Sequence, residues 1–574
     1  MLKPLSGLVP FGALQAFAFW VPLLLFLSFA FAGGTPWADL WTSPAKIASI
    51  RQTLWIAAQV TLVSGVLAYV YVGALLAASP RWRAVLLLCV IVPFLTSIVV
   101  RTYAWIIVLG PSGPVNAALR AVLGPDGTIE FIYNRSGVLI GMVHVLLPMF
   151  VLPLYAVASQ IPRNLNPAAR TMGANKVAAW FAVDMRLGLS GAAAGAALVF
   201  IQALGFFVTP AMLGGVGDTM IAQFIERDMQ TSVDLGAAAS LSLVLVAAVA
   251  FCVAVFRMFY PLEGLFIQTE AGTAAGRRAG KGGVRLLPVG LADALDRSWL
   301  AITEKLAYLP WMWLTRAGAI LIAIYFLLPL VVVLPVSLTG DEFLQFPPSS
   351  YDGRWYPRVL LDPDWRLAIA NSMLVGVMAV VVALLAALPL AFVVVRAALP
   401  QGLRGLLIGV LLLPAIVPTI VLSVGVYVWF LNTKLVASLP ALALAHAVLG
   451  LPFAALILIS ALKDFDPRLE NAARSLGAGP VRTLLLVTLP LLIAPLVSGA
   501  LLAFLTSFDE LLIARAVTNF ETVTLSVKLW TGANQEISPA LAVISVVSMA
   551  VTLVGAILLA VLSWLNMRQM GPSR

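Results

Sequence analysis

The chain has 574 residues, of which 61% are hydrophobic and 10% charged, whereas soluble chains carry roughly 25% charged residues. Many apolar runs reach about 20 residues, the length that crosses about 30 Å of hydrocarbon, so this composition excludes a soluble globular protein. The runs are continuous, which favours an all-α polytopic membrane protein over a β-barrel, and the net charge of +10 is typical of loops held on the cytoplasmic side rather than of a nucleic-acid partner.

The first predicted span lies near residues 12–33. Lys3 and the stretch "AFAGG" at 30–34 also resemble a signal peptide with a cleavage site. The run from Phe11 to Ala32 is long enough to cross a membrane and similar spans follow it, so we expect an uncleaved first helix. Eleven further spans are predicted near 53–79, 84–109, 136–160, 188–213, 238–260, 315–338, 367–395, 403–430, 438–462, 488–513 and 541–566. Lys and Arg concentrate in the loops that lie on the same side of the membrane as the N-terminus. The positive-inside rule therefore predicts that both termini are cytoplasmic.

A long segment without a span separates the sixth and seventh spans. Its first part, "AGTAAGRRAGKGG", is Gly-rich and basic and indicates a flexible linker. This stretch is not a phosphate-binding loop, because Ala275 and Gly282 stand where that motif needs Gly and Ser or Thr. A helical spacing of apolar residues then predicts an amphipathic helix on the inner leaflet, formed by Leu291, Leu295, Trp299, Ile302 and Leu306.

The two sets of six spans form an internal repeat. A shift of 304 residues places Pro148 on Pro452 and Gly173 on Gly477. We therefore predict a first repeat over 1–262, the linker and amphipathic helix over 263–313, and a second repeat over 314–574. Two six-span units in the same orientation are a parallel repeat, with the transport path expected between the halves.

The most similar parts of the two repeats follow the fourth span of each half, at about 162–186 and 464–490. In the second copy, Asp466 and Pro467 suit the start of a short helix, and Gly477 suits its end. Small residues Ala472 and Ala473 let another surface approach closely. A single copy would also fit an interfacial loop meeting anionic headgroups of membrane lipids, but two copies at matching positions indicate a docking element.

This pattern resembles the "EAA" loop of binding-protein-dependent ABC importer permeases, which reads Glu-Ala-Ala, three residues, Gly, nine residues, an apolar residue, any residue and Leu-Pro. The second copy has Asn471-Ala472-Ala473, Gly477 and then Val487, Leu489 and Pro490. In that family the loop inserts into a groove of the ATPase subunit and transmits its motion. The resemblance implies this coupling role for Pro167, Ala168, Ala169, Arg170, Gly173, Glu470, Asn471, Ala472, Ala473, Arg474 and Gly477.

Both copies depart from the family pattern. Asn471 and Pro167 replace the usual Glu, and Glu470 stands one residue early. The first copy also has Met185 and Arg186 in place of Leu-Pro. We therefore expect the two loops to engage their ATPases unequally, with the second loop mattering more.

Other stretches resemble the two separate permease subunits of polyamine/opine/phosphonate-type importers. Residues 101–116 and 200–215 resemble the first subunit, and 337–356, 371–373 and 507–517 resemble the second. The resemblance implies two fused type I permease subunits in the bacterial inner membrane. It also implies that the chain binds no cofactor itself: ATP and Mg²⁺ would belong to a cytoplasmic ATPase dimer, and a periplasmic solute-binding protein would deliver the solute.

The transport path is expected between spans three to six of each half. Asp509 and Glu510 are candidates to meet a cationic group, since charge inside a membrane is costly, although a solvated outer helix end is the alternative. Arg101 would attract an anionic group while Tyr103 and Trp105 stack on an amine, or the three would form an aromatic belt with a snorkelling Arg.

An apolar gate is a further hypothesis for this path, with core packing as its equal alternative; the residues concerned are Phe206, Phe207 and Phe508. His144 and His446 are expected to form helix contacts. Cys89 and Cys252 lie in apolar spans and are interpreted as small hydrophobic residues, so neither a metal site nor a catalytic centre is predicted.

The predicted function is ATP-driven import of a small amine-containing solute, of the aminophosphonate or polyamine class, by alternating access. Phe206 stands where polyamine permeases often carry Glu, which favours a small zwitterionic amine. Import of ferric iron or opine-type compounds, or secondary transport by a six-plus-six repeat, are the alternatives. A membrane enzyme is disfavoured, because no span carries paired carboxylates with His.

Overall fold

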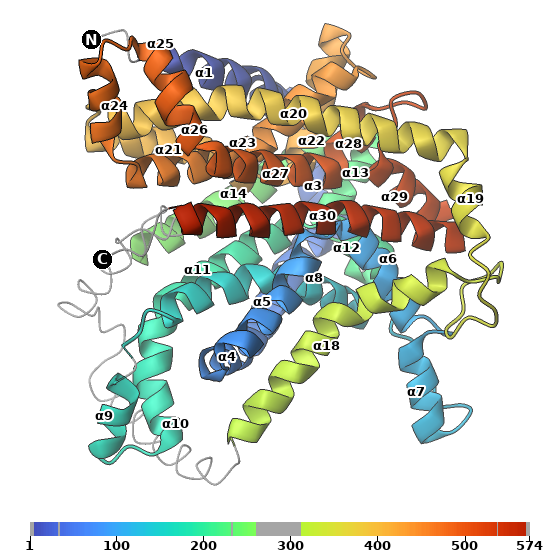
Figure 1. Cartoon of the computed structure of the whole chain (residues 1–574). Helices are drawn as coiled ribbons and strands as arrows, with labels where there is room; N and C mark the ends of the chain where they lie inside the picture. Colours follow the sequence, from blue (N-terminus) through green and yellow to red (C-terminus); the bar gives the residue numbers. More distant parts are fainter. Residues whose placement is uncertain are drawn as a thin grey trace.

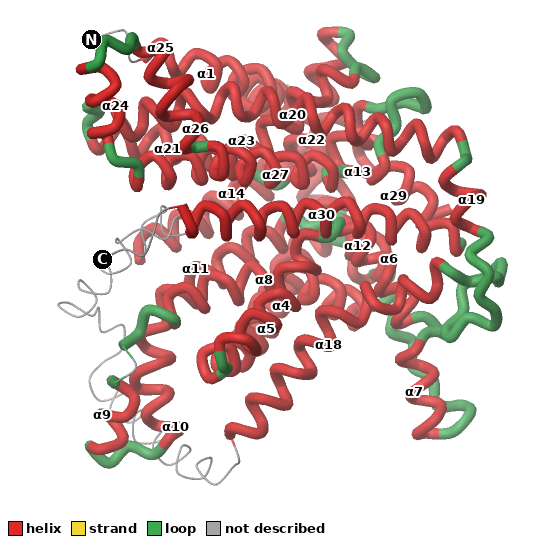
Figure 2. Tube along the Cα trace, in the orientation of Figure 1, coloured by secondary structure: helices red, strands yellow, loops and turns green. Residues whose placement is uncertain are grey.

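The computed structural model describes residues 5–32, 35–162, 164–230, 234–259, 311–535 and 538–569. Figure 2 shows helices, in red, along most of the described chain, and these ranges contain no strand beyond an isolated bridge between Thr339 and Tyr351. The predicted all-α class is therefore confirmed. The predicted amphipathic helix and most of the linker over 263–313 lie outside the described residues.

The first half begins with an interrupted helix that is followed by long and short helices in turn. The interrupted helix comprises η1 (Leu5–Leu8), α1 (Val9–Gln15), η2 (Ala16–Trp20), α2 (Val21–Ser28) and η3 (Phe29–Phe31). The other elements are α3 (Thr35–Thr42), α4 (Pro44–Ala77), α5 (Pro80–Leu95), α6 (Ile98–Leu109), α7 (Pro114–Leu123), α8 (Arg135–Ala158), α9 (Leu165–Thr171), α10 (Lys176–Ala179), η4 (Trp180–Met185), α11 (Arg186–Leu204), α12 (Val208–Leu213), η5 (Val216–Asp218), α13 (Ile221–Gln230) and α14 (Leu235–Phe259).

The second half repeats this order of long helices, although its first helix is continuous and α7 has no helical counterpart among the described residues. It contains α18 (Trp311–Ser337), α19 (Trp355–Leu360), α20 (Pro363–Arg396), α21 (Gln401–Ile416), α22 (Thr419–Thr433), α23 (Leu439–Asp464), α24 (Pro467–Ser475), α25 (Pro480–Thr483), η6 (Leu484–Thr488), α26 (Leu489–Leu491), α27 (Ile493–Asp509), α28 (Leu512–Val517), α29 (Leu525–Gln535) and α30 (Pro539–Gln569).

Nine described helices are long and apolar enough to cross a membrane, or up to 11 if two bent pairs each count as one span. The segments predicted as single spans over 84–109 and 403–430 are not continuous helices. Each is two helices, and α21 and α22 meet at 92°. Pro93 and Pro414 lie in the last turn of α5 and α21. Pro418 follows the second break, where it disfavours a helical backbone at Val417.

The predicted fifth and eleventh spans also end earlier than expected. α11 stops at Leu204 and α27 at Asp509, and the short helices α12 and α28 follow. The second half has an additional bend of 74° between the helical segment Pro480–Leu491 and α27. The breaks between α5 and α6 and between α11 and α12 thus have counterparts in the second half, between α21 and α22 and between α27 and α28.

The first helix of each half packs on the other half. α2 contacts α22, and α18 contacts α4, α5 and α6. The approach of α2 is close at Gly425, where a Cβ would lie 2.7 Å from the carbonyl oxygen of Pro22. Small residues permit such close helix approach in membranes, so the halves are interlocked.

The centre of each half is a crossing of two helices at a small residue. Gly195 of α11 meets the backbone of Phe150 in α8, and a Cβ there would lie 3.0 Å from the Phe150 Cα. A shift of 304 residues gives Gly499 of α27 and Ala454 of α23, where the same distance is 3.2 Å. The repeat therefore extends to the packing of its core helices.

The repeated loop segments lie at one end of the molecule. Figure 1 shows α9 and α10, and separately α24 and α25, on the left side of the view, whereas α7 and α19 lie on the right. We call the first the loop end and the second the far end.

Candidate functional site

The two repeated loops fold into the same helix-turn-helix. In the second loop, Gly477 N–H donates to the Arg474 carbonyl and Ala478 N–H to the Ala473 carbonyl, both at 3.0 Å. The first loop has the same two bonds after α9. This is the Schellman motif, and its left-handed position is occupied by Gly477 (φ 85°) and Gly173 (φ 98°), where a Cβ would be strained.

The start and the outer face of α24 agree with the sequence prediction. Asp466 caps the helix by accepting a bond from Arg468 N–H at 2.9 Å, and Pro467 is its first residue. Most of the predicted coupling residues are exposed, namely Pro167, Ala168, Arg170, Gly173, Asn471, Ala472, Arg474 and Gly477, with Ala169 and Ala473 half-buried.

An apolar side chain projects from the tip of each loop. Met172 is 88% exposed and Leu476 is 89% exposed, and the two positions are again 304 residues apart. A singly exposed apolar residue is common on protein surfaces, but here the same tip position is apolar and exposed in both copies of the repeated loop. Sequence reasoning missed this pair, although the shift that aligned the loops also aligns these residues.

Glu470 lies inside the second loop instead of on its surface. It is 6% exposed, and the Thr488 hydroxyl donates to its Oε1 at 3.2 Å. Its Oε2 lies 3.7 Å from Arg396 Nε and 3.9 Å from Arg474 Nη2. We call the helices before and after the turn at Gly477 the two arms of the loop, α24 being the first and α25 with η6 the second. Glu470 therefore joins the two arms to each other and to α20.

The first loop has a polar pair at the same two positions. Asn166 Nδ2 donates to Asp184 Oδ2 at 2.5 Å. The shift of 304 residues places Asn166 on Glu470 and Asp184 on Thr488. The contact between the two arms is thus present in both halves. The acidic residue is Glu470 on the first arm of the second loop, and Asp184 on the second arm of the first loop.

Arg396 ties the second loop to the end of α20. Its Nη2 donates to the Phe465 carbonyl at 3.2 Å, and its guanidinium lies 5.6 Å from the centre of the Phe465 ring. In the first half, Arg83 of α5 donates instead to the carbonyls of Leu75 and Ala78 at the end of α4. The second loop therefore has a connection to a long helix through a charged side chain.

A cavity of about 350 Å³ lies between the two halves, within the range typical of small-molecule sites. Its walls come from α5, α6, α8 and α11 of the first half and from α21–α23, α27 and α28 of the second. The lining is apolar except for Arg101, Gln202, Thr419, Thr506, Asp509 and Glu510. Four of the predicted path residues thus meet at one cavity: Arg101, Phe206, Asp509 and Glu510.

Arg101 and Asp509 bring opposite charges to this cavity from opposite halves. Arg101 stands in the first turn of α6 and is 3% exposed. Asp509 is the last residue of α27, and its Oδ1 accepts a bond from the Ile98 N–H at the start of α6 at 3.0 Å. A carboxylate at a helix N-terminus is favourable, so the broken third span provides a contact between the halves.

Glu510 holds protein structure on the cavity wall. Its Oε1 accepts from Ile513 N–H at 2.9 Å and its Oε2 from Ala514 N–H at 3.0 Å, at the start of α28. His446 Nε2 lies 3.1 Å from the same Oε2, and His446 Nδ1 lies 2.8 Å from Ser507 Oγ. Asp509 is therefore better placed than Glu510 to meet a solute.

The three predicted gate residues point to different places. Phe206 lines the cavity. Phe207 packs on Trp530 with ring centres 5.2 Å apart, and Phe508 stacks on Phe504 at 5.7 Å. They do not form one apolar gate, and core packing accounts for two of them.

Tyr103 and Trp105 are buried beside the cavity rather than exposed in an aromatic belt. Tyr103 donates to the Ser538 carbonyl at 3.0 Å, and the Trp105 ring meets His144 edge-on at 5.5 Å. The alternative of a belt with a snorkelling Arg101 is contradicted, because all three side chains are at most 3% exposed.

A second contact between the halves lies outside the predicted residues. Arg515 donates to Glu226 Oε1 at 2.6 Å and to Gln230 Oε1 at 2.9 Å, and its guanidinium lies 5.5 Å from the Trp530 ring centre. We call Glu226, Arg515 and Trp530 the clasp. It borders a cavity of about 400 Å³, and no motif in the sequence indicated it.

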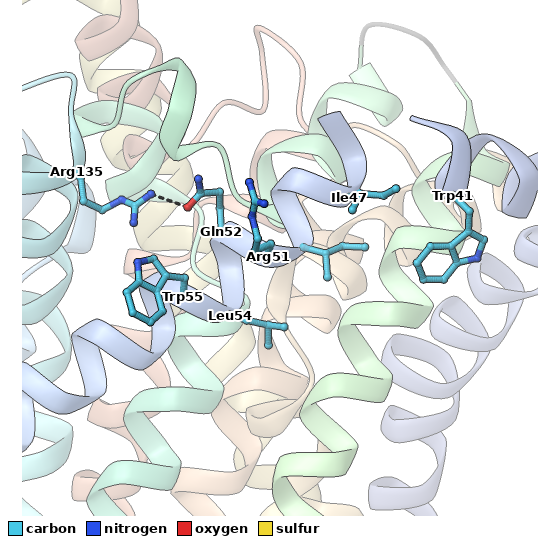
Figure 3. A pocket seen from close by; sticks show the side chains of 8 residues that line it. Trp41, Ile47, Arg51, Gln52, Leu54, Trp55 and Arg135 are labelled. Atoms are coloured by element: carbon cyan, nitrogen blue, oxygen red, sulfur yellow. Dashed lines mark hydrogen bonds between the residues drawn. The ribbon is translucent and has the colours of Figure 1, made fainter. Parts of the chain in front are cut away.

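A wide, mostly apolar pocket of about 770 Å³ lies along α3 and the start of α4 (Figure 3). Trp41 and Trp55 line it with exposed rings, and Arg135 donates to Gln52 at 2.6 Å on one side. It shares no lining residue with the central cavity. Its exposed tryptophans are typical of a surface that meets lipid.

The sequence matches the family model "Binding-protein-dependent transport system inner membrane component" twice, over residues 69–262 and 379–566. Each match contains one repeated loop and one wall of the central cavity.

Individual relatives agree with this match. The chain is 32% identical over 205 residues to the spermidine/putrescine transport system permease protein PotB of Escherichia coli (strain K12), covering 35% of this chain and 74% of PotB. It is 27% identical over 216 residues to the putrescine transport system permease protein PotI of the same organism, covering 36% and 76%. It is 28% identical over 475 residues to the probable ABC transporter permease protein y4fN of Sinorhizobium fredii (strain NBRC 101917 / NGR234), covering 80% and 77%.

Proposed function

Because the chain belongs to the family of binding-protein-dependent transport system inner membrane components, we propose that its two halves together form the complete membrane path of one importer. The chain is a multi-pass permease subunit of an ABC importer and carries the permease unit twice. The proposed partners are a cytoplasmic ATPase dimer at the loop end and a periplasmic solute-binding protein at the far end. Both termini would then be cytoplasmic.

The coupling role of the two loops carries this proposal. Their exposed small residues leave room for a close-fitting surface, and Met172 and Leu476 offer apolar tips to a groove. The Schellman turns fix the angle between the two arms of each loop. Each loop continues through a π-helical turn toward α11 or α27, so that a displaced loop would move a helix of the cavity wall.

The proposed mechanism is alternating access. ATP binding would draw the two ATPase subunits together, and the two loops would move with them. The far end, held by the clasp, would then open to accept solute from the binding protein. ATP hydrolysis would return the halves to the state in which the clasp is closed.

The proposed solute is a small amine that passes through the central cavity. Asp509 supplies a carboxylate there, and PotB and PotI are named for transport of spermidine and putrescine or of putrescine alone. The permease itself would perform no bond chemistry.

An uptake experiment separates this function from secondary transport. The chain is reconstituted in proteoliposomes with its ATPase and binding protein, and uptake of that binding protein's ligand is measured. The importer requires ATP and continues after ionophores collapse the ion gradients. Uptake that stops with the gradient but persists without ATP would contradict the proposal.

A further inference from the structure

One face of α4 is exposed along several turns and carries its charge at one end. From position 51 to position 66 the exposed residues recur at helical spacing, and they are Arg51, Leu54, Trp55, Ala58, Leu62, Val63 and Val66. All of them except Arg51 are apolar. Such a face of a membrane-spanning helix lies against acyl chains, so Arg51 stands where the apolar face ends.

The depth of Arg51 in the membrane follows from the course of α8 and α4. The first loop follows the end of α8, and Arg135 at its start donates to Gln52 at 2.6 Å, so this turn of α4 lies at the end of α8 opposite the loop. The stretch of α4 from Arg51 to Ala77 spans about 39 Å at about 1.5 Å per residue. A bilayer with its headgroups is about 40–45 Å thick. When Ala77 lies at one membrane surface, Arg51 therefore lies among the headgroups of the other.

The pocket of Figure 3, at this end of α4, is lined by positive charge and by no carboxylate. Its charged lining residues are Arg51 and Arg135. Arg135 is already engaged, since its Nε lies 2.5 Å from Asp218 Oδ1 and its Nη2 donates to Gln52. Arg51 is exposed and makes no hydrogen bond or ion pair within the described ranges. Its guanidinium thus offers five N–H donors to a group outside the chain.

Two tryptophans flank the position of such a group. Trp41 of α3 and Trp55 of α4 are 59% and 58% exposed. In Figure 3 the guanidinium of Arg51 and the amide of Gln52 lie above the Trp55 ring, on the polar side of the pocket. Exposed tryptophans of membrane proteins lie at the level of the lipid headgroups, with an apolar ring body and an N–H donor.

A phospholipid combines the two features that this surface requires. Its phosphate accepts two parallel N–H bonds from a guanidinium, and its acyl chains cover an apolar helix face. An additional ammonium group, as in phosphatidylethanolamine, finds no carboxylate among the residues that line the pocket. The pocket therefore favours a headgroup with a net negative charge.

We propose that this pocket binds one anionic phospholipid, with its phosphate at Arg51 and its acyl chains along the exposed face of α4. The volume of about 770 Å³ holds the headgroup and the start of the chains, which continue over Leu62 and Val66. This inference goes beyond the importer function proposed above, because it concerns neither the solute nor the ATPase nor the binding protein.

The lipid site adjoins the segment that carries part of the clasp. Arg135 pairs with Asp218 of η5, and the Thr53 hydroxyl accepts from the N–H of Ile221, the first residue of α13, at 2.8 Å. Glu226 of the clasp lies on the same helix. A lipid seated on α3 and α4 therefore stabilises the packing on which α13 rests.

The second half has a matching helix without this site. α20, like α4, begins with a proline and has 34 residues. Counted from the first residue of each helix, Ala370 stands at the position of Arg51 and Leu374 at that of Trp55. Arg366, an exposed residue one turn nearer the start of α20, does not line the pocket and provides a matched control.

The test uses the full chain, purified in a neutral detergent, and measures the midpoint of its thermal unfolding. The probes are phosphatidylglycerol, phosphatidylethanolamine with the same acyl chains, and inorganic phosphate. Phosphatidylglycerol raises the midpoint, because it binds the folded state, and the other two probes leave it unchanged. Native mass spectrometry of the same preparation retains one phosphatidylglycerol per chain.

Substitutions at Arg51 locate the site. Arg51→Gln weakens the apparent affinity for phosphatidylglycerol about 10-fold, as expected for the loss of a charged hydrogen bond, and Arg51→Lys retains part of the response. Both variants keep the lipid-free midpoint of the wild type, because Arg51 is exposed and has no partner within the described ranges. Arg366→Gln changes neither value.

The inference is overturned if phosphatidylethanolamine or inorganic phosphate stabilises as strongly as phosphatidylglycerol, or if no probe stabilises. It is also overturned if Arg366→Gln weakens the lipid response as much as Arg51→Gln. ATP-driven uptake is measured in a separate experiment and depends on other residues, so a failure of the lipid site leaves the importer function standing.

Discussion

At each loop, two residues far apart in the chain close the contact between its arms. The pair is Glu470 with Thr488 in the second loop and Asn166 with Asp184 in the first. The positions are the same in the repeat, while the acidic residue lies on the first arm in the second loop and on the second arm in the first loop. Only the second pair adds Arg396, so we expect the second loop to follow α20 more rigidly.

Glu470→Ala tests this contact. The substitution leaves the Thr488 hydroxyl without its acceptor and Arg396 without its counter-ion, which costs about 1–3 kcal/mol for buried polar groups. We expect less solute transported per ATP hydrolysed, measured in proteoliposomes, with unchanged membrane insertion.

Glu470→Gln is the matched variant for this prediction. It keeps an acceptor for Thr488 and loses only the charge opposite Arg396, so its effect is expected to be intermediate. Transport per ATP equal to wild type in the Ala variant would show that the contact has no part in coupling.

The position of Glu470 illustrates which site properties the sequence could predict. The Ala-Ala-Arg and Gly pattern predicted the helix, its cap and its turn, because these depend on neighbouring residues. The side on which Glu470 lies depends on its packing against Thr488 and α20, which are distant in the chain. The motif alone suggested an exposed docking residue.

At the scale of helices, hydropathy predicted where apolar segments lie but not where they break. The residues around Pro93 and Pro414 are apolar on both sides, so one continuous span was expected at each place. The breaks matter for function, since α6 begins with the amide that binds Asp509 and carries Arg101 in its first turn.

The clasp links α13 of one half to α28 and α29 of the other, and it is expected to respond to pH. Burial raises the pKa of Glu226 above its ordinary value, and Arg515 opposes this rise. Glu226 therefore takes up a proton at a higher pH than an exposed glutamate. The protonated form is favoured by the fold, so this contribution to stability is present at low pH and lost as the pH rises through the raised pKa.

Acidification should thus release the clasp without unfolding the protein. Spin labels at Arg227 and Thr531, exposed positions on α13 and α29, report the distance between the halves. We expect longer and broader distances as the pH falls, and the same distances at every pH in Glu226→Gln. Distances that change neither with pH nor with Glu226→Gln would show that the ion pair does not hold the far end.

At the scale of the whole molecule, the two permease units are interlocked by their first helices. α2 packs on α22 and α18 packs on α4–α6. The sequence predicted two six-span units of equal orientation from the shift of 304 residues. The sequence contained no signal that the first helix of each half packs on the other half, because these helices are apolar on all faces.

A split chain tests the interlocking. A cut inside residues 263–310 leaves each unit with its own first helix, which needs the surface of the other half. We expect the two fragments to co-purify when expressed together, with a tag on one of them. Each fragment expressed alone should be recovered poorly, and stable, monodisperse fragments would contradict the account.

The central claim is that the two loops connect this permease to an ATPase, and uptake per ATP hydrolysed tests it most directly. The measurement compares wild type with Ala472→Trp/Gly477→Trp and with the matched pair Ala168→Trp/Gly173→Trp, at equal amounts of inserted protein. Trp fills the space left by the small residues, and at Gly477 and Gly173 it also strains a left-handed backbone. We predict that both pairs of substitutions uncouple hydrolysis from uptake, the second-loop pair more strongly. Normal uptake per ATP in both variants would contradict the account.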